Sequence, residues 1–252
     1  MLSKNDIKNI KSLEQKKFRT EKGLFIAQGH KLVGELLGKF ECVLLAATSD
    51  WMQTRRSIPA ARVETVTPDE LKRASLQQAP QDVLAVFRIP QDSTTLSAAA
   101  SANLVLALDD VQDPGNLGTI VRIADWFGIK HIFCSKATAD IYNPKAIQAT
   151  MGAIARVSVH YTDLGRDING LPRTTPVYGT FLEGDIIYDT QLTENGVIVM
   201  GNEGNGIGHV VAAAVNRKLY IPNWPQGAKT SESLNVAIAT AVVCSEFRRR
   251  SR

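Results

Sequence analysis

Short, continuously apolar runs in the second part of the chain constrain the fold more than any other feature. They cover residues 104–108, 131–134, 177–181, 197–200 and 219–221, and helical patterns lie between them. A strand that is apolar at every position is buried on both faces, which is typical of a parallel sheet covered by helices. The sequence therefore predicts an α/β domain with a parallel sheet over residues 104–252.

The first part of the chain also alternates between strand and helix patterns. Apolar strands are predicted at residues 24–27, 42–47 and 82–87, with a helix at residues 30–37. Another helix is predicted to start at Thr67, because Thr suits the N-cap, Pro68 the first helical position and Glu70 the third position of a capping box. Residues 1–90 are thus predicted to form a small α/β domain. Residues 91–103, rich in Ser, Thr and Ala, are the predicted linker.

The basic charge of the chain lies in its first third. The 252 residues have a net charge of +4, and residues 1–90 hold 15 Lys and Arg against 10 Asp and Glu. A helix predicted at residues 7–13 brings Lys4, Lys8 and Lys11 to one face. This basic ridge suits a polyanion such as RNA or DNA, but an ordinary solvated surface has the same composition. Charge alone leaves both interpretations open.

Several protein classes are excluded at this point. No apolar run approaches the roughly 20 residues that span a bilayer, so no membrane association is expected. The polar start lacks the apolar core of a secretion signal, and the three cysteines have no paired spacing, which together predict a cytoplasmic protein. The four histidines and three cysteines are not spaced as metal ligands either, so no metal site is expected.

The first candidate loop, residues 109–122, follows a buried strand and opens a helix. Asn116 is placed to cap that helix, and Arg122 follows six residues later, within two turns of the same helix end. A cation there could face a ligand above the sheet edge. A capping Asn and an unrelated surface Arg would give the same spacing, and this reading also stays open.

The second candidate loop, residues 201–208, has four glycines in eight residues. Glycines let a backbone approach a ligand closely, as in loops that hold nucleosides or nucleotides, although a simple turn is equally rich in glycine. The glycine order is not the dinucleotide fingerprint, and no strand ending in an acidic residue follows about 20 positions later. A nucleotide-dependent oxidoreductase is therefore excluded.

The third segment joins the strand at residues 219–221 to a helix predicted to begin near Ser231 or Ser233. That helix is apolar almost all round for three turns, so we expect it to be buried. Asn235 near its start then needs polar partners. It either braces neighbouring backbone or contacts a ligand.

Together and in this order, the three segments resemble the motifs of the SpoU, or TrmH-like, family of RNA ribose 2′-O-methyltransferases in the SPOUT superfamily. The matches are residues 116–118 with Arg122, residues 201–204 with Gly206, and residues 221–222 with residues 233–236. The resemblance covers residues 104–247 closely. Residues 25–37 resemble more loosely the ribosomal-protein-like RNA-binding domain of that family.

The resemblance implies a SPOUT domain over residues 104–252 with a deep trefoil knot at its carboxyl end. It also implies S-adenosylmethionine as the cofactor. The pocket would be lined by Thr180, Gly201, Gly206, Ile221 and Leu234.

The implied reaction is methyl transfer from S-adenosylmethionine to a ribose 2′-hydroxyl of RNA, in the first place ribosomal RNA. Arg122 matches the catalytic arginine of the family. It would bind the adjacent phosphate and orient the ribose, or pass the hydroxyl proton to that phosphate. Asn116 and Glu203 would hold Arg122 and its loop, while Asn235 with Ser233 would order the third loop.

The family also implies a homodimer whose site lies at the subunit contact. Phosphate contacts are expected from cations of the first domain. These are Lys4, Lys8, Lys11, Lys16, Lys17 and Arg19. Transfer RNA is the alternative target, and a non-catalytic RNA-binding or ribosome-assembly protein of the same fold is the alternative function.

Overall fold

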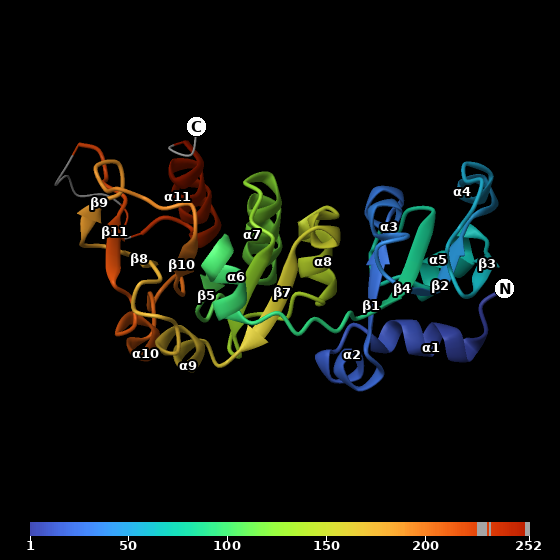
Figure 1. Ribbon diagram of the computed structural model, residues 1–252. Helices are drawn as coiled ribbons and strands as arrows, with labels where there is room; N and C mark the ends of the chain where they lie inside the picture. Colours follow the sequence, from blue (N-terminus) through green and yellow to red (C-terminus); the bar gives the residue numbers. More distant parts are fainter. Residues whose placement is uncertain (226–230, 232, 250–252) are drawn as a thin grey trace. The chain divides into compact units, whose positions relative to one another are not determined.

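The computed structural model describes residues 1–225, 231 and 233–249, which form two compact units (Figure 1). The first unit comprises residues 1–91 and 140–155, and the second comprises residues 92–139 and 156–252. Each unit has its own sheet. No helix in the described part of the chain is long and apolar enough to cross a membrane.

The first unit is built on a four-stranded sheet in the order β1-β4-β2-β3. Its strands are β1 (Leu24–Gln28), β2 (Cys42–Ala47), β3 (Val63–Thr65) and β4 (Val83–Arg88). Strand β4 runs antiparallel to β1 and β2, while β3 runs parallel to β2. The helices are α1 (Lys4–Ser12), α2 (Lys16–Lys22), α3 (His30–Leu36), α4 (Ser49–Gln53) and α5 (Pro68–Ala74).

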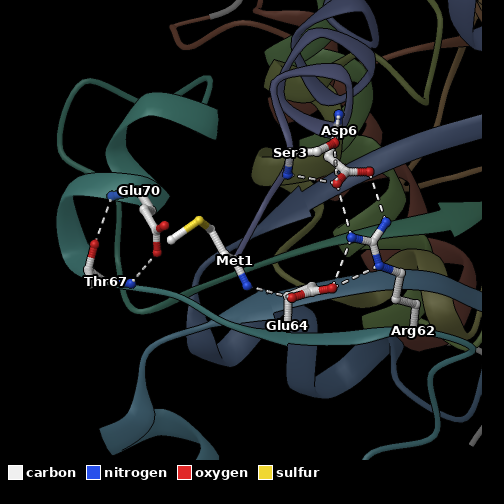
Figure 2. Close-up of polar contacts among 7 residues, drawn as sticks. All are labelled: Met1, Ser3, Asp6, Arg62, Glu64, Thr67 and Glu70. Carbon is white, nitrogen blue, oxygen red and sulfur yellow. Dashed lines mark hydrogen bonds and ion pairs between the residues drawn. The ribbon is translucent and has the colours of Figure 1, made fainter.

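Helices α1 and α5 share one core with the sheet. Ile10 of α1 and Leu71 of α5 are buried in the same apolar cluster as Ile26, Leu84 and Val86 of the strands. The predicted capping box of α5 is present, since Thr67 Oγ1 accepts from the amide of Glu70 and the Glu70 carboxylate accepts from the amide of Thr67 (Figure 2).

A polar cluster fixes the start of α1 (Figure 2). Ser3 caps the helix in a second capping box with Asp6, and the Asp6 carboxylate also accepts two bonds from Arg62, at 2.9 and 3.0 Å. Arg62 reaches Glu64 as well, whose other oxygen lies 2.7 Å from the N-terminal amino group of Met1. The Arg62 hydrogen bonds, the largest cause, hold the pKa of Asp6 well below its usual range. This cluster ties the basic helix α1 to strand β3.

Residues 140–155 belong to the first unit, although the sequence analysis placed them in the second domain. They form α8 (Pro144–Thr150) and a 3₁₀ turn at Ala153–Ala155. The Tyr142 ring lies 4.9 Å from the Phe25 ring of β1. A Cβ on Gly152 would lie 2.7 Å from Cβ of Glu35, so only glycine permits this close approach. These contacts join segments far apart in the sequence, which local patterns do not reveal.

The second unit contains the predicted parallel sheet, with seven strands in the order β7-β6-β5-β10-β8-β11-β9. Every pairing in it is parallel. The strands are β5 (Leu104–Leu108), β6 (His131–Ser135), β7 (Ser158–Thr162), β8 (Val177–Phe181), β9 (Asp185–Ile186), β10 (Gly196–Met200) and β11 (Arg217–Tyr220). Strands β5 and β10 are buried at every position, which confirms the interpretation of the apolar runs.

Helices cover both faces of this sheet. On one face α6 (Leu96–Ala102), α9 (Leu164–Asn169) and α10 (His209–Ala212) pack with β5, β6, β8 and β10 in one apolar core. Helix α7 (Pro114–Trp126) packs against α11 (Val236–Arg249) (Figure 1). Phe247 of α11 contacts Tyr178 of β8 edge-on.

Two predictions about this unit are corrected. The segment 91–103 is not a simple linker, because its second half forms α6, capped by Thr95, and buries Leu96, Ala99 and Ala100 in the core. Helix α11 begins at Val236 rather than near Ser231 or Ser233, and it is not buried all round, since Ile238 is 56% exposed. Its apolar outer face therefore lies at the surface of the chain.

Candidate active site

At the end of the first loop, helix α7 is capped by Asp113 rather than by Asn116. Asp113 is the N-cap, its carboxylate accepts the Asn116 amide at 2.8 Å, and Pro114 takes the first helical position. The prediction that Asn116 caps the helix is therefore wrong. Because Asn116 sits inside the first turn, its side chain is free of capping and projects to the other loops.

Two hydrogen bonds, each between a side chain and a backbone group, hold the first loop against the glycine-rich loop. Asp109 Oδ2 accepts from the Gly208 amide at 2.8 Å, and the Asn202 side chain donates to the Asp110 carbonyl at 2.9 Å. Asp110 itself has φ 59°, in the left-handed region that Asp tolerates better than most residues, and its amide donates to Ser135 Oγ. The loop after β5 is thus held in one conformation from both sides.

An amide relay connects all three predicted motifs. Asn116 Nδ2 donates to Glu203 Oε1 at 2.7 Å, and Asn116 Oδ1 accepts from Asn235 Nδ2 at 3.1 Å. The orientation of the Asn116 amide is fixed, because a carboxylate can only accept. Asn235 in turn accepts from the amides of Ala237 and Ile238, so it caps α11 and contacts Asn116 at once.

The glycine-rich loop is a tight turn whose shape requires glycine. Asn202 and Gly206 exchange backbone hydrogen bonds, each 2.9 Å long. A Cβ on Gly201 would lie 2.3 Å from the carbonyl carbon of Gly206, and Gly206 has φ 69°. Any side chain at Gly201 would therefore force the turn open.

The residues assigned to the cofactor pocket lie along one edge of the sheet. Thr180 is near the carboxyl end of β8, Gly201 follows β10 and Ile221 follows β11, and these three strands are neighbours. In parallel α/β sheets, ligands bind at the carboxyl ends of the strands. Leu234 is exposed and directly precedes Asn235 of the relay.

Arg122 lies two turns into α7 with an exposed side chain. Within the described part of the chain it makes no hydrogen bond or ion pair with Asn116 or Glu203, and neither does the exposed Ser233. The relay therefore orders the loops without holding the guanidinium.

The predicted RNA-binding cations of the first unit fall into two groups. Lys4, Lys8 and Lys11 are exposed along α1, and Lys16 and Lys17 are exposed on α2. Arg19 is a correction, because its side chain is only 2% exposed. It donates to the carbonyls of Leu13 and Glu14 and pairs with Asp140 at 2.6 Å, so it holds the turn between α1 and α2 instead of facing RNA.

The cysteines are unsuited to nucleophilic catalysis. All three are buried and unpaired. Burial raises the pKa of Cys42 to about 11 and that of Cys244 to about 12, and it raises the pKa of Cys134 as well. A protonated thiol is a weak nucleophile.

No individual role was predicted for three site residues, Asp109, Asp110 and Asn202, although all three lie in the predicted loops. The sequence feature that could have pointed to Asp109 and Asp110 is their position as an acidic pair directly after a buried strand, where the functional loops of parallel sheets lie. Their role depends on contacts about 90 residues away, which spacing cannot show.

Comparisons with known proteins agree with this geometry. The model of the SpoU rRNA Methylase family matches residues 103–245, and that of the MRM3-like substrate binding domain matches residues 4–85. The 23S rRNA (guanosine(2553)-2′-O)-methyltransferase RlmP of Bacillus subtilis is 30% identical over 96% of this chain and 95% of its own length.

Solved structures show the same fold over the whole chain. A putative RNA methyltransferase of the TrmH family from Porphyromonas gingivalis has a TM-score of 0.91 and 41% identity, covering 99% of both chains. An AdoMet-bound rRNA methyltransferase from Sinorhizobium meliloti has a TM-score of 0.81 and 27% identity, covering 99% of this chain and 96% of that one. With three motifs joined by one amide relay and a family match over most of its length, this chain belongs to the SpoU rRNA methylase family.

Proposed function

We propose that this chain transfers a methyl group from S-adenosylmethionine to a ribose 2′-hydroxyl of ribosomal RNA. The observation that carries the proposal is the relay from Glu203 through Asn116 to Asn235, which brings the three motifs of the family into contact. The relative from Bacillus subtilis is named for ribose methylation of 23S rRNA, so ribosomal RNA is the target favoured here. A ribosomal substrate also favours the cytoplasm as the location.

The described residues fit S-adenosylmethionine at the carboxyl ends of β8, β10 and β11. Gly201 leaves no room for a side chain, so the loop offers bare backbone to a ligand. Thr180, Gly201, Gly206, Ile221 and Leu234 would hold the cofactor, largely through main-chain groups. When bound, S-adenosylmethionine supplies an electrophilic methyl group on a positively charged sulfur.

Arg122 is the residue proposed to touch the RNA beside the reacting ribose. Its guanidinium is exposed and matches a phosphate in a bidentate manner. A group that stays protonated at every relevant pH is a poor base, so its role is to bind the phosphate and fix the direction of the 2′-hydroxyl. Positioning of this kind supplies a large part of the rate when the reacting groups need only alignment.

Asn116, Glu203, Asn235 and Ser233 act as positioning residues in this proposal. The relay fixes the first and second loops against the start of α11. Loops that are already in place need no ordering when the cofactor binds, which lowers the free-energy cost of binding.

The first unit is the proposed RNA-binding part of the chain. The lysines of α1 and α2 are exposed, and none of the five pairs with an acidic side chain in the described residues. Unpaired cations lose no partner when they bind phosphate. The match to an MRM3-like substrate binding domain over residues 4–85 supports the same role.

A homodimer completes the proposal. Arg122 and Trp126 lie four residues apart on α7 and thus share one face of that helix. Trp126 is 84% exposed, and Ile238 of the adjoining helix α11 is exposed as well. A second copy covering this apolar face would bury the tryptophan and bring partner residues close to Arg122. Sedimentation of Trp126→Glu as a monomer, with the parent as a dimer, tests this step.

We also propose that the carboxyl end of the second unit forms a trefoil knot. In support, β8 lies between β10 and β11 in the sheet although it precedes both in the chain. The segment after β11 then returns to α7, where Asn235 meets Asn116. A crystal structure in which residues 221–249 pass outside the loop after β5 would refute the knot.

The reaction is tested by mixing the purified chain and labelled S-adenosylmethionine with ribosomal RNA or transfer RNA from a strain that lacks this gene. The proposal predicts label in a 2′-O-methylnucleoside of ribosomal RNA, and no label with Arg122→Ala. Label only in transfer RNA would show that transfer RNA, and not ribosomal RNA, is the substrate. Cofactor binding without transfer to either RNA would favour a non-catalytic ribosome-assembly protein.

A further inference from the structure

A cluster of potential metal ligands lies in the second unit, apart from the loops of the active site. It consists of Asp92, His131 and His160, whose ligand atoms all lie within 4.8 Å of one another. His131 is the first residue of β6, whereas the active-site loops follow the carboxyl ends of β5 and β10. The amino and carboxyl ends of parallel strands lie at opposite ends of the sheet, so this cluster is separate from the active-site loops.

The two histidines meet because of the register of two neighbouring strands. His131 pairs with Ser158 and Phe133 pairs with His160, so both imidazoles lie on one face of the sheet, two residues out of step. The His160 ring stacks on Phe133 at 4.6 Å with an interplanar angle of 17°. With a side chain that is only 8% exposed and packed in this way, His160 has a fixed ring orientation.

Three potential ligand atoms lie close together beside these rings. His131 Nδ1 lies 3.2 Å from His160 Nε2, which in turn lies 3.8 Å from Asp92 Oδ2. The other Asp92 oxygen, Oδ1, accepts from the amide and the hydroxyl of Thr94. Thr94 thereby turns Oδ2 towards the histidines.

These separations suit a tetrahedral zinc ion. Zinc–nitrogen bonds of about 2.0–2.1 Å at a tetrahedral angle place two nitrogens about 3.3–3.4 Å apart. The distance from His131 Nδ1 to His160 Nε2, 3.2 Å, is close to this value. An Asp92 oxygen lies within 4.8 Å of both nitrogens, 3.8 Å from His160 Nε2, and would have to move closer to complete the site. Two imidazoles and one carboxylate are also a donor set that zinc accepts, with water as the fourth ligand.

The ring nitrogens that approach each other are His131 Nδ1 and His160 Nε2, which leaves His131 Nε2 and His160 Nδ1 to carry the ring hydrogens. Each imidazole can therefore offer one nitrogen to a metal ion.

We infer that Asp92, His131 and His160 bind one zinc ion, which fastens the start of the second unit to its edge strand. Asp92 is the first residue of that unit and lies just before α6, while His160 lies in β7, at one end of the seven-stranded sheet. The ion would stabilise this edge and take no part in methyl transfer. Local spacing does not reveal such a site, because 29 residues separate the two histidines.

The test uses the full-length protein after dialysis against a chelator. Calorimetric titration with zinc chloride is expected to give one ion per chain, and saturating zinc is expected to raise the melting temperature by about 5 °C. Cobalt chloride in place of zinc is expected to give the visible absorption of a tetrahedral site. His160→Gln and Asp92→Asn are each expected to weaken zinc binding by more than the roughly 10- to 100-fold typical of second-shell changes.

The matched control is His30→Gln, which alters an exposed histidine of the first unit and is expected to leave zinc binding unchanged. Circular dichroism without metal shows whether each variant is folded. Asp92→Asn, at an exposed position, keeps the test valid if His160→Gln unfolds. The inference is overturned if folded parent protein does not bind zinc, which would leave a metal-free His131–His160 hydrogen bond, or if both variants bind zinc as tightly as the parent.

Discussion

Asn116→Asp perturbs the amide relay at one bond only. The new carboxylate still accepts from Asn235 Nδ2, but it can no longer donate to Glu203, which lies 2.7 Å away. A hydrogen bond to a charged group contributes about 1.5–3 kcal/mol, and its loss corresponds to a decrease of about 10- to 150-fold in kcat/KM if the whole effect reaches the transition state. Repulsion between the two carboxylates adds to this loss.

The repulsion gives the variant a distinct pH dependence. Two carboxylates this close share a proton, which raises one apparent pKa of the pair. Protonation restores a donor between residues 116 and 203, so the ratio of variant to parent activity should rise as the pH falls. Methyl transfer to ribosomal RNA from pH 5.5 to 8.5 and calorimetric titration with S-adenosylmethionine measure both effects.

A second substitution tests the geometry directly. Combining Asn116→Asp with Glu203→Gln exchanges donor and acceptor across the same 2.7 Å contact, and the double variant should recover cofactor affinity relative to Asn116→Asp. Asn195→Asp is the control, since it adds the same charge elsewhere in the second unit, where the Asn195 side chain donates to the Ser101 carbonyl. A double variant no tighter than the single one, or a single variant equal to the parent, would refute this reasoning.

Arg122→Ala should abolish methyl transfer and leave S-adenosylmethionine affinity within a few-fold, and loss of cofactor binding by the folded variant in calorimetry would contradict the assigned role. Charge reversal at Lys8 and Lys11 should weaken RNA binding and flatten its dependence on salt, whereas an unchanged slope would remove α1 from the RNA-binding surface. Asp6→Asn should lower the melting temperature at pH 7, because the ionised Asp6 carboxylate stabilises the fold through its hydrogen bonds with Arg62. The lowered pKa of Asp6 reflects this stabilisation, which is present only where the carboxylate is ionised. That difference should shrink as the pH falls below about 4, and a difference independent of pH would contradict the assignment.

Much of the second unit could be predicted from the sequence because its strands carry their own signal. Strand β5 occupies the predicted residues, since a run buried on both faces has to be apolar at every position, and β8 also has the predicted bounds although its last two residues are only partly buried. The resemblance to the SpoU family implied that the three loops lie together, and Asn116, Glu203 and Asn235 do meet.

The misplaced features depend on contacts between distant segments. Arg19 has the composition of an RNA-binding cation, but its burial results from Asp140, 121 residues away. Asp113 and Asn116 are both good capping residues, and only the position of Glu203 explains why Asn116 is used elsewhere. The histidine pair depends on strand register in the same way.

The central claim is methylation of a ribose 2′-hydroxyl in ribosomal RNA. Its most direct test is mass spectrometry of nucleosides from the ribosomal RNA of three strains: parent, gene deletion, and deletion carrying Arg122→Ala. The account predicts one 2′-O-methylnucleoside that is present in the parent and absent from the other two. An unchanged set of ribose-methylated nucleosides in all three strains, or loss of a base-methylated nucleoside instead, would contradict it.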